Sequence, residues 1–290
     1  MTGRKFDKAS PVSILEYEPF MPGPGGPMPD KNELILVEKG AVCSIVFNRP
    51  EKRNLLTPGM LLGLEKALEK LGKEGRTRCV VIRGAGDKAF SSGYDISSIG
   101  RDDMIKNHSG ENPLPRAVKS IKNFPYPVIA MLNGHAFGAG LEIAATCDIR
   151  TAAKGSLLGM PPAKLGVIYS YRGVKTFLNL IGPGYTKELF LTGRPIDSER
   201  AERMGLVNFT LPAEELEKFT YDMAVEITEN APLSLKGLKE MVNIWQRNQV
   251  IREEDEELLK KLTLSVQQSE DYKEGQRSFA EKRKPVFKGK

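Results

Sequence analysis

The sequence contains little cysteine and histidine, and this scarcity argues against two kinds of stabilising site. It has three cysteines in 290 residues, Cys43, Cys79 and Cys147, each isolated in an apolar stretch. An odd, scattered count argues against a disulfide framework and indicates a reducing compartment. The two histidines, His108 and His135, do not cluster with cysteines. We therefore expect no zinc site and no other bound metal.

Long apolar runs are also missing. No run approaches the roughly 20 residues of a membrane-spanning helix, and the longest runs, such as PVIAML, fit buried strands. The first ten residues, MTGRKFDKAS, are charged and lack the apolar centre of a secretory signal. Together with the cysteine usage, these absences predict a cytoplasmic protein with no membrane partner.

The net charge of +6 leaves the class of ligand open. Basic residues mostly alternate with acids, as in IREEDEELLKK, and the one dense basic run, EKRKPVFKGK, ends the chain. No nucleic-acid-binding motif accompanies that run. The charge fits a solvated tail or a small phosphate-bearing ligand, and we expect no nucleic-acid partner.

Strand and helix patterns alternate along the chain, which predicts an α/β fold. We expect residues 1–30 to form an arm, because its segment PFMPGPGGPMPD is too rich in proline and glycine for a helix or strand. Two strands are expected in ELILVEKGAVCSIVFNRP, and others in RCVVIRG, YPVIAMLNG and DIRTAA. The spacing of apolar residues in TPGMLLGLEKALEKLGKEG predicts a helix that begins after Thr57 and stops at Gly72.

The last third of the chain is mostly helical. GYTKELFLTG predicts a short helix ending at Gly193, and DSERAERMGLV a second one capped by Asp197 or Ser198. Longer amphipathic patterns follow to the C-terminus. We expect a core over residues 31–230 and a helical C-terminal region over 231–290.

Two strand-to-helix turns carry the candidate chemistry. One passes through SSG into Tyr94 and Asp95, and the other passes through GAG into LEIA. The N-terminus of a helix has unpaired backbone N–H groups and a partial positive charge, and glycine lets a ligand approach them. One N–H group from each turn could therefore converge on a developing oxyanion, although each turn alone also fits an ordinary connection. Asp95 and Asp148 are expected to support the loop and the strand beside them.

Taken together, the motifs resemble the enoyl-CoA hydratase/isomerase (crotonase) superfamily. The matching segments, in the family's order over about residues 34–287, are FNRPEKRNLLT, KAFSSGYDI, NGHAFGAGLEIAATCDIR, LGMPPAKLGV, LTGRPIDSERAERMGLVN and EGQRSFAEKRKPVF. The resemblance implies a spiral of strand–strand–helix turns with a helical C-terminal region that drives assembly into homotrimers, often stacked as hexamers. It also implies an acyl-CoA thioester substrate, with coenzyme A carried in as part of the substrate and no separate cofactor.

The resemblance assigns residues around the thioester. The backbone N–H groups of Tyr94 and Ala139 correspond to the donors that stabilise the thioester enolate, although the family usually has glycine at the second position. Glu142, three residues after Ala139, occupies the position of the family's first catalytic glutamate. The same acid also fits a residue that merely complements the helix N-terminus.

The resemblance also assigns five residues to coenzyme A. Lys52 and Arg53 correspond to residues near the nucleotide, and Ala89 to one that offers its backbone to the pantetheine or adenine. Phe279 and Lys282 resemble residues that close over coenzyme A, often from a neighbouring subunit. Lys282 equally fits a solvated tail.

The chain departs from the family at the second acid. A two-glutamate hydratase reads roughly FGxPExxLG there, whereas this chain reads LGMPPAKLG, with Pro162 in place of the acid. Proline cannot transfer a proton, so the usual acid–base pair is missing and isomerases that need this acid are disfavoured. A family member, methylmalonyl-CoA decarboxylase, resembles this region and has a tyrosine at the position of Tyr169 that holds the substrate carboxylate. Tyr169 also fits a core aromatic residue with a bonded hydroxyl.

The sequence favours a hydratase-type lyase of fatty acid metabolism, in which Glu142 deprotonates water and returns the proton to the enolate. A malonyl-type acyl-CoA decarboxylase, with Tyr169 holding the leaving carboxylate, is the alternative. An enoyl-CoA isomerase and a non-catalytic CoA- or RNA-binding homologue also stay open, and the intact loops and Glu142 argue against the non-catalytic reading.

Overall fold

The computed structural model describes residues 13–15, 33–95, 113–248 and 253–289. Its larger sheet has seven strands in the order β1-β2-β3-β4-β6-β8-β11. Their bounds are β1 Ser13–Leu15, β2 Leu34–Lys39, β3 Val42–Phe47, β4 Cys79–Gly84, β6 Val128–Leu132, β8 Ile149–Ala153 and β11 Phe209–Leu211. Strands β1, β2 and β3 pair antiparallel, and all pairs from β3 to β11 are parallel. The parallel strands are rich in valine and isoleucine because both of their faces are covered.

Strand β1 differs from the sequence expectation, because it lies inside the segment interpreted as an arm. Ser13–Leu15 pairs in register with β2, from Ser13 opposite Glu38 to Leu15 opposite Leu36. The segment SIL precedes the run of proline and glycine, so its backbone is free to join an edge of the sheet. The rest of residues 1–30 lies outside the described part of the chain.

A smaller sheet has the strand order β10-β9-β7-β5. Its strands are β5 Ala89–Ser91, β7 His135–Phe137, β9 Leu157–Gly159 and β10 Ile196–Asp197. Three of them follow directly on strands of the large sheet, in the pairs β4–β5, β6–β7 and β8–β9, and a helix comes next along the chain. This repetition produces the spiral of strand–strand–helix turns that the resemblance implied.

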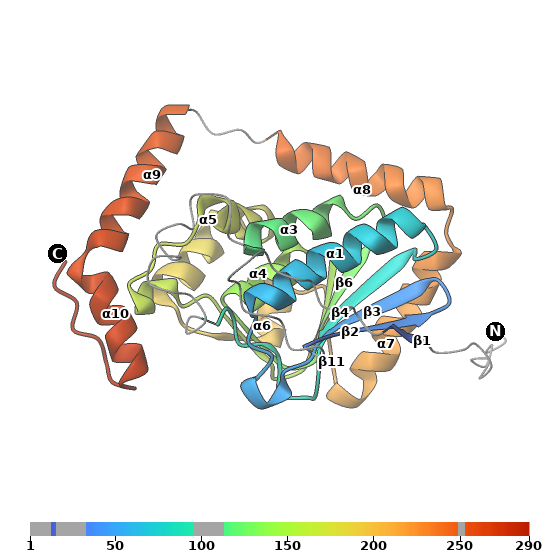
Figure 1. The fold of residues 1–290 in the computed structure, drawn as a ribbon, viewed down its shortest axis with the longest axis horizontal. Coiled ribbons are helices and arrows are strands. Elements are labelled where there is room, and N and C mark those ends of the chain that lie inside the picture. Colours follow the sequence, from blue (N-terminus) through green and yellow to red (C-terminus); the bar gives the residue numbers. More distant parts are fainter. Residues whose placement is uncertain (1–12, 16–32, 96–112, 249–252, 290) are drawn as a thin grey trace, which may run out of the picture.

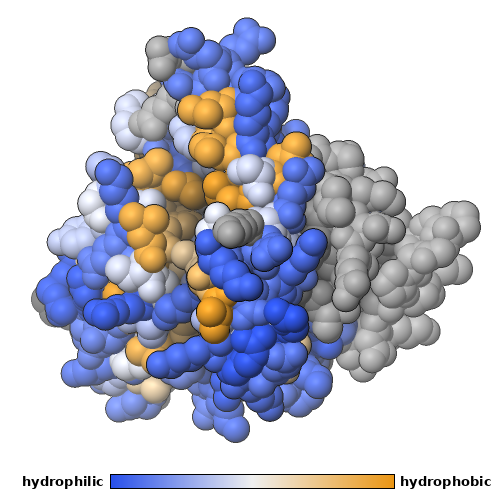
Figure 2. Space-filling view, turned by 90° about the vertical axis from the view of Figure 1, so that its left-hand side faces the viewer, coloured by the Kyte–Doolittle hydropathy of each residue, from blue (hydrophilic) through white to orange (hydrophobic). Residues whose placement is uncertain are grey.

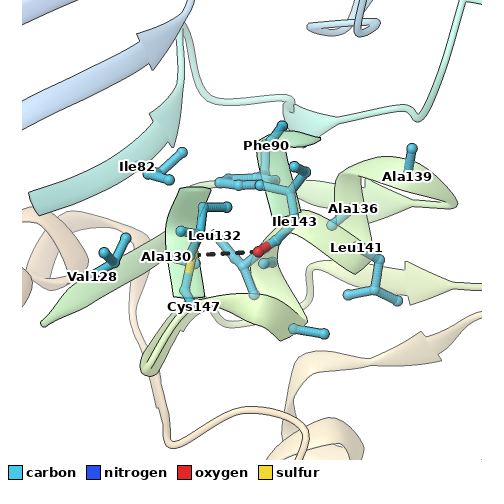
Figure 3. Close-up of a cluster of buried hydrophobic side chains, with 14 of the residues drawn as sticks. Ile82, Phe90, Val128, Ala130, Leu132, Ala136, Ala139, Leu141, Ile143 and Cys147 are labelled. Carbon is cyan, nitrogen blue, oxygen red and sulfur yellow. Dashed lines mark hydrogen bonds between the residues drawn. The ribbon is translucent and has the colours of Figure 1, made fainter. Parts of the chain in front are cut away.

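Helices cover both faces of the large sheet (Figure 1). One face carries the larger core, beneath α1 Pro58–Glu74, α3 Pro113–Asn123 and α4 Ala139–Thr146. The other face packs against α7 Ala213–Glu229 and has a smaller core. Figure 3 shows α4 within the larger core, with Ile143 beside Leu132 of β6 and Leu141 on another side of the helix. Each buried aliphatic side chain of this kind contributes about 1.5–3 kcal/mol, which fixes the rotation of α4.

The helix boundaries follow local signals with one correction. The hydroxyl of Thr57 accepts a hydrogen bond from the Met60 N–H at 3.1 Å, so Thr57 caps α1 as predicted. The predicted stop at Gly72 is wrong, because α1 runs to Glu74 and Gly75 terminates it at φ 69°. A Cβ on Gly72 would lie 3.5 Å from Cδ of Pro125, an ordinary contact, so the packing at this position does not require glycine.

The helix expected to end at Gly193 is the second half of α5 Tyr171–Thr192, which has non-helical geometry at Gly182. Asp197 caps α6 Ser198–Arg203 by accepting the Arg200 N–H at 2.7 Å. The remaining helices are α8 Pro232–Arg247, α9 Glu253–Gln268 and α10 Glu270–Ala280. None of the helices within the described ranges is both long enough and apolar enough to cross a bilayer.

The C-terminal helices lie outside the two-sheet core. In Figure 1, α8 runs along the side of α1 and α3, and α9 and α10 extend at the far end of the molecule. Apolar side chains on α8 and α9 are exposed: Leu233, Leu238, Met241, Val242, Ile244, Trp245, Leu258, Leu262 and Leu264. Figure 2 shows apolar patches between polar side chains at the end of the molecule that carries α9 and α10.

Candidate functional site

The first candidate oxyanion donor is the Tyr94 N–H group, in the loop after β5. Gly93 precedes it at φ 109°, a conformation that side-chain-bearing residues rarely adopt. The carbonyl of Gly93 accepts the Leu56 N–H at 2.8 Å, and the carbonyl of Leu56 accepts the Asp95 N–H at 2.9 Å. These bonds attach the loop to the segment that leads into α1. Asp95 adds an ion pair with Arg49 at 3.5 Å, which agrees with its expected supporting role.

The second candidate donor is the N–H group of Ala139, the first residue of α4. Gly138 precedes it as the N-cap at φ 52° and forms no side-chain cap. The two turns meet closely, since a Cβ on Gly93 would lie 3.9 Å from the Ala139 nitrogen. A Cβ on Gly140 would lie only 2.6 Å from Cβ of Ser91 at the end of β5. The glycines therefore let the two turns pack against each other and place both candidate N–H groups in one region.

Glu142 lies in the first turn of α4 and is only 5% exposed. Its backbone N–H donates to the Gly138 carbonyl at 3.0 Å, so the helix already holds its main chain. Its side chain accepts a hydrogen bond from the Tyr169 hydroxyl, with Oη and Oε2 2.6 Å apart. This distance is typical of a strong bond between a hydroxyl and a carboxylate.

Tyr169 comes from the segment between the short 3₁₀ helix η4, Pro162–Leu165, and the start of α5. Its ring contacts Phe190 edge to face, with centroids 5.7 Å apart. Gly173 opens the space for the pair, because a Cβ there would lie 2.5 Å from Cε1 of Tyr169 and 3.0 Å from Oε1 of Glu142. Two segments that are distant in sequence, α4 and the stretch from Tyr169 into α5, therefore meet at the carboxylate.

Burial dominates the electrostatics of this pair. It raises the pKa of Glu142, while the hydrogen bond from Tyr169 and the charge of Lys122 oppose the rise. Burial and the neighbouring Glu142 carboxylate raise the pKa of Tyr169 well above its ordinary value. Glu142 thus keeps its proton to a higher pH than a solvated glutamate, and Tyr169 stays a phenol that donates.

Pro162 is buried in η4. Its carbonyl accepts the Val167 N–H at 2.9 Å, which shapes the turn that leads to Tyr169. The position of the family's second acid therefore carries a structural residue that cannot exchange a proton.

The residues expected to bind coenzyme A lie in two regions of the structure, one around Lys52, Arg53 and Ala89 and the other at the end of α10. Lys52 and Arg53 follow one another at the end of η1, Pro50–Lys52, and both are exposed. The Ser92 N–H donates to the Arg53 carbonyl at 3.0 Å, so this pair lies beside the loop of Tyr94. Ala89 begins β5, and its carbonyl accepts Nδ2 of Asn54 at 2.7 Å.

Phe279 lies in the last turn of α10 and is 63% exposed, and Lys282 follows just after the helix. Figure 1 shows α10 apart from α1 and the large sheet. The helix touches η4 instead, where a Cβ on Gly275 would lie within 2.2 Å of the Leu165 carbonyl oxygen. Within one chain, the structure does not bring Phe279 and Lys282 to the Lys52–Arg53 pair.

Two further residues at the site escaped the sequence analysis. Lys122, near the end of α3, acts electrostatically on Glu142, and Gly173 makes room for Tyr169. Neither has a local signal, since both roles depend on how α3 and α5 pack around α4. Asp148 has the role expected of it, because Oδ2 accepts the Val128 N–H at 2.7 Å and so fixes the start of β6.

The three cysteines and His135, which the structure describes, form no cluster that suggests a metal. Among the residues that the structure describes, no three His, Cys, Asp or Glu side chains are grouped to hold an ion. His108 lies outside those residues. The three cysteines are free and buried, and burial raises the pKa of each thiol to about 12.

Comparisons with known proteins agree with this geometry. The chain matches the family model for enoyl-CoA hydratase/isomerase over residues 37–290. It is 35% identical to methylmalonyl-CoA decarboxylase of Escherichia coli (strain K12) over 260 residues, which is 88% of this chain and 97% of the relative.

Two solved structures show the same fold at different similarity. Methylmalonyl-CoA decarboxylase in complex with 2-nitronate-propionyl-CoA superimposes with a TM-score of 0.83 at 33% identity, over 89% of this chain and 99% of that one. An enoyl-CoA hydratase from Bacillus anthracis gives 0.70 at 30% identity, over 89% of this chain and 100% of that one. The chain therefore belongs to the enoyl-CoA hydratase/isomerase (crotonase) superfamily of acyl-CoA-processing enzymes.

Proposed function

We propose that the protein is an acyl-CoA decarboxylase that acts on a malonyl-type thioester. The observation that carries this proposal is the Tyr169 hydroxyl, held 2.6 Å from a buried Glu142, where the chain has Pro162 instead of a second acid. One carboxyl and one phenol suit a reaction that needs no strong base for its bond-breaking step.

The proposed reaction breaks the bond between the α-carbon of the acyl group and its carboxylate. The electron pair of that bond moves into the thioester and forms an enolate, and the carboxylate leaves as CO2. The N–H groups of Tyr94 and Ala139 would stabilise the enolate oxygen, because they are fixed donors at the start of a helix and in a rigid loop. One proton is then added to the α-carbon.

Tyr169 and Glu142 would divide the remaining work. Tyr169 stays protonated, and because a neutral Glu142 can donate its own proton to the phenol oxygen, the single O–H of Tyr169 can turn to the substrate carboxylate and hold it in place. Glu142 keeps its proton to a raised pH and could deliver it to the enolate after CO2 has left. Burial of the pair would also favour the loss of a charged carboxylate as a neutral gas.

The coenzyme A portion would be held by separate elements. We assign the nucleotide to Lys52 and Arg53, with the backbone of Ala89 beside the pantetheine or adenine. Phe279 and Lys282 would close over coenzyme A from the α10 helix of a neighbouring subunit, which fits their exposure on the isolated chain.

We also propose that the protein assembles as a homotrimer or hexamer. The exposed apolar side chains of α8 and α9 support this proposal, because single chains rarely leave so many large apolar side chains in water on two helices. Light scattering at micromolar protein should give a mass of three or six chains, and a monomeric mass would contradict it.

The similarity to methylmalonyl-CoA decarboxylase supports decarboxylation, at 35% identity and with the higher of the two TM-scores. Hydration of an enoyl-CoA is the second candidate, since Glu142 retains the position of the family's first catalytic acid. In that reaction Glu142 would have to act as a base, and burial disfavours its ionised form.

The test is an assay of the purified protein with malonyl-type CoA esters and with crotonyl-CoA, and Glu142→Gln and Tyr169→Phe are compared with the unchanged protein. We expect CO2 release that depends strongly on Tyr169, with little hydration. Hydration of crotonyl-CoA without CO2 release from any malonyl-type ester would overturn decarboxylation. In that case Glu142→Gln should lower hydration by about 100-fold or more.

A further inference from the structure

Arg49 lies between two carboxylates beside the loop that carries the Tyr94 N–H. Its Nε is 3.1 Å from Oε1 of Glu33, the residue before β2. Its Nη1 donates to the Leu55 carbonyl at 3.2 Å and lies 3.5 Å from Oδ2 of Asp95. The side chains of Arg49, Glu33 and Asp95 are 18%, 15% and 13% exposed, so salt screens these ion pairs only weakly. One guanidinium therefore joins three segments of the chain.

The guanidinium is itself held in place. The second carboxylate oxygen of Glu33 accepts the Thr57 hydroxyl at 2.9 Å, and Thr57 is the N-cap of α1. The Arg49 N–H donates to Oδ1 of Asn54 at 3.0 Å, and the Arg49 carbonyl accepts the Asn54 N–H at 2.8 Å. Asn54 is fully buried at φ 53°, a conformation in which asparagine is enriched. The turn after β3 and the start of α1 thus fix the position of the guanidinium.

The bonds of Leu56 determine the direction of the Tyr94 N–H. Leu56 and Tyr94 form a parallel bridge, in which the Leu56 N–H donates to the Gly93 carbonyl and the Leu56 carbonyl accepts the Asp95 N–H. The C=O and N–H of one trans peptide point in opposite directions. Because the Gly93 carbonyl points at Leu56, the Tyr94 N–H points away from it. Arg49 bonds to the chain on both sides of this bridge, at the carbonyl before Leu56 and at the carboxylate of Asp95.

We propose that Arg49 is a positioning residue for the oxyanion donor: its guanidinium, anchored by Glu33, holds the Leu56–Tyr94 bridge so that the Tyr94 N–H stays directed at the thioester oxygen. The inference rests on the proposed function in one respect, that this N–H stabilises an enolate. It does not depend on how the enolate forms, since decarboxylation and hydration place negative charge on the same oxygen.

The expected effect falls on the reaction and not on the binding of coenzyme A. A displacement of about 1 Å at a reacting group can cost roughly 100-fold in rate. Arg49→Met cannot bond to any of the three partners, so kcat should fall about 10- to 100-fold while KM changes by less than about threefold. Arg49→Lys keeps the charge but lacks the planar fork that spans Glu33 and Asp95, so it should recover only part of the rate.

The spectroscopic test needs no turnover. Acetyl-CoA labelled with 13C at the thioester carbonyl is bound to each variant at saturation, and infrared difference spectroscopy measures the carbonyl stretch, whose frequency falls when the oxygen accepts hydrogen bonds. Titration calorimetry with coenzyme A measures the binding of the rest of the molecule. We expect Arg49→Met to lose at least about half of the downshift, since one of two donors is displaced, with the affinity for coenzyme A unchanged within about threefold.

Arg116→Met is the control, because it removes an arginine that also joins two segments through an ion pair. Nη2 of Arg116 on α3 is 2.8 Å from Oε2 of Glu65 on α1. This variant should keep both the downshift and kcat. Glu33→Gln releases the anchor but leaves the guanidinium, and it should show the same loss as Arg49→Met at a smaller size. It replaces Arg49→Met if that variant does not fold.

A full carbonyl downshift in Arg49→Met would overturn the inference, as would an equal loss in Arg116→Met. A lower Tm with the downshift retained would also overturn it, because the arginine would then only stabilise the fold. A smaller downshift in Arg49→Met without CO2 release from any malonyl-type ester would refute the decarboxylase and retain the role of Arg49. CO2 release by the unchanged protein, with a downshift that does not depend on Arg49, would do the reverse.

Discussion

The hydrogen bond between Tyr169 and Glu142 leads to the sharpest prediction. Tyr169→Phe removes one oxygen from a contact of 2.6 Å and leaves the ring against Phe190 in place. A hydrogen bond to a charged group contributes about 1.5–3 kcal/mol. If the phenol makes such a bond to the substrate carboxylate in the transition state, its loss should slow CO2 release by roughly 10- to 150-fold, since about 1.4 kcal/mol corresponds to a tenfold change in rate.

The same substitution has an effect on the free protein. Glu142 loses the donor that favours its ionised form, so its pKa should rise further. Below that pKa the acid is neutral and the loss of stability should be small, whereas above it a buried carboxylate lacks its donor. Thermal unfolding followed by circular dichroism should therefore show a larger deficit for Tyr169→Phe at high pH than at low pH.

Tyr171→Phe is the matched control, because it makes the same chemical change two residues away at the start of α5. CO2 release from a malonyl-type CoA ester is the assay for both variants. Undiminished release by Tyr169→Phe, or an equal loss in both variants, would refute the assigned role of the phenol.

Three other predictions concern the backbone, the C-terminal helix and the thiols. Tyr94→Pro removes the candidate oxyanion N–H and should lower turnover by about 100- to 1000-fold while coenzyme A still binds. Tyr94→Ala keeps the N–H and should keep most of the rate. Near-normal turnover in a folded proline variant would show that the donor is assigned wrongly. Gly275→Ala should displace α10 from η4, because its Cβ would lie within 2.2 Å of the Leu165 carbonyl oxygen, and calorimetry should show a lower Tm, while an unchanged Tm would contradict this contact. The three buried cysteine thiols should resist alkylation in the native protein, and rapid labelling at neutral pH would disprove their burial. The free energy of unfolding should fall as pH rises from about 9 to about 12, because the thiols ionise first in the unfolded chain.

Local patterns in the sequence were enough to predict most elements of the core. Runs such as RCVVIRG and YPVIAMLNG predict buried parallel strands because such strands are covered on both faces, and they correspond to β4 and β6. Thr57 and Asp197 were recognisable as helix caps, since a capping side chain bonds within three residues along the chain. The predicted stop at Gly72 was wrong because a glycine inside a helix costs only about 1 kcal/mol relative to alanine, and Gly75 supplies the positive φ that ends α1.

The sequence also placed the turns of Tyr94 and Ala139 and the position of Glu142, because each belongs to a continuous motif. The missing second acid was visible as Pro162 for the same reason. Sequence reasoning weighed hydration above decarboxylation, since hydration is the broader behaviour of the family. The structure adds the contact that changes this balance in our proposal, namely the hydroxyl of Tyr169 on the carboxylate of Glu142.

Only the tertiary structure shows which segments far apart in the chain lie in contact at the site. Tyr169 and Glu142 are 27 residues apart, and their bond depends on the space that Gly173 leaves on α5. Lys122 acts on Glu142 because α3 packs beside α4, and no periodicity within α3 records the charge of its neighbour. The sequence determined the candidate donors, the acid and the phenol of the site, because each lies in a local motif. Packing raises the pKa of Glu142, because burial is a property of the assembled core.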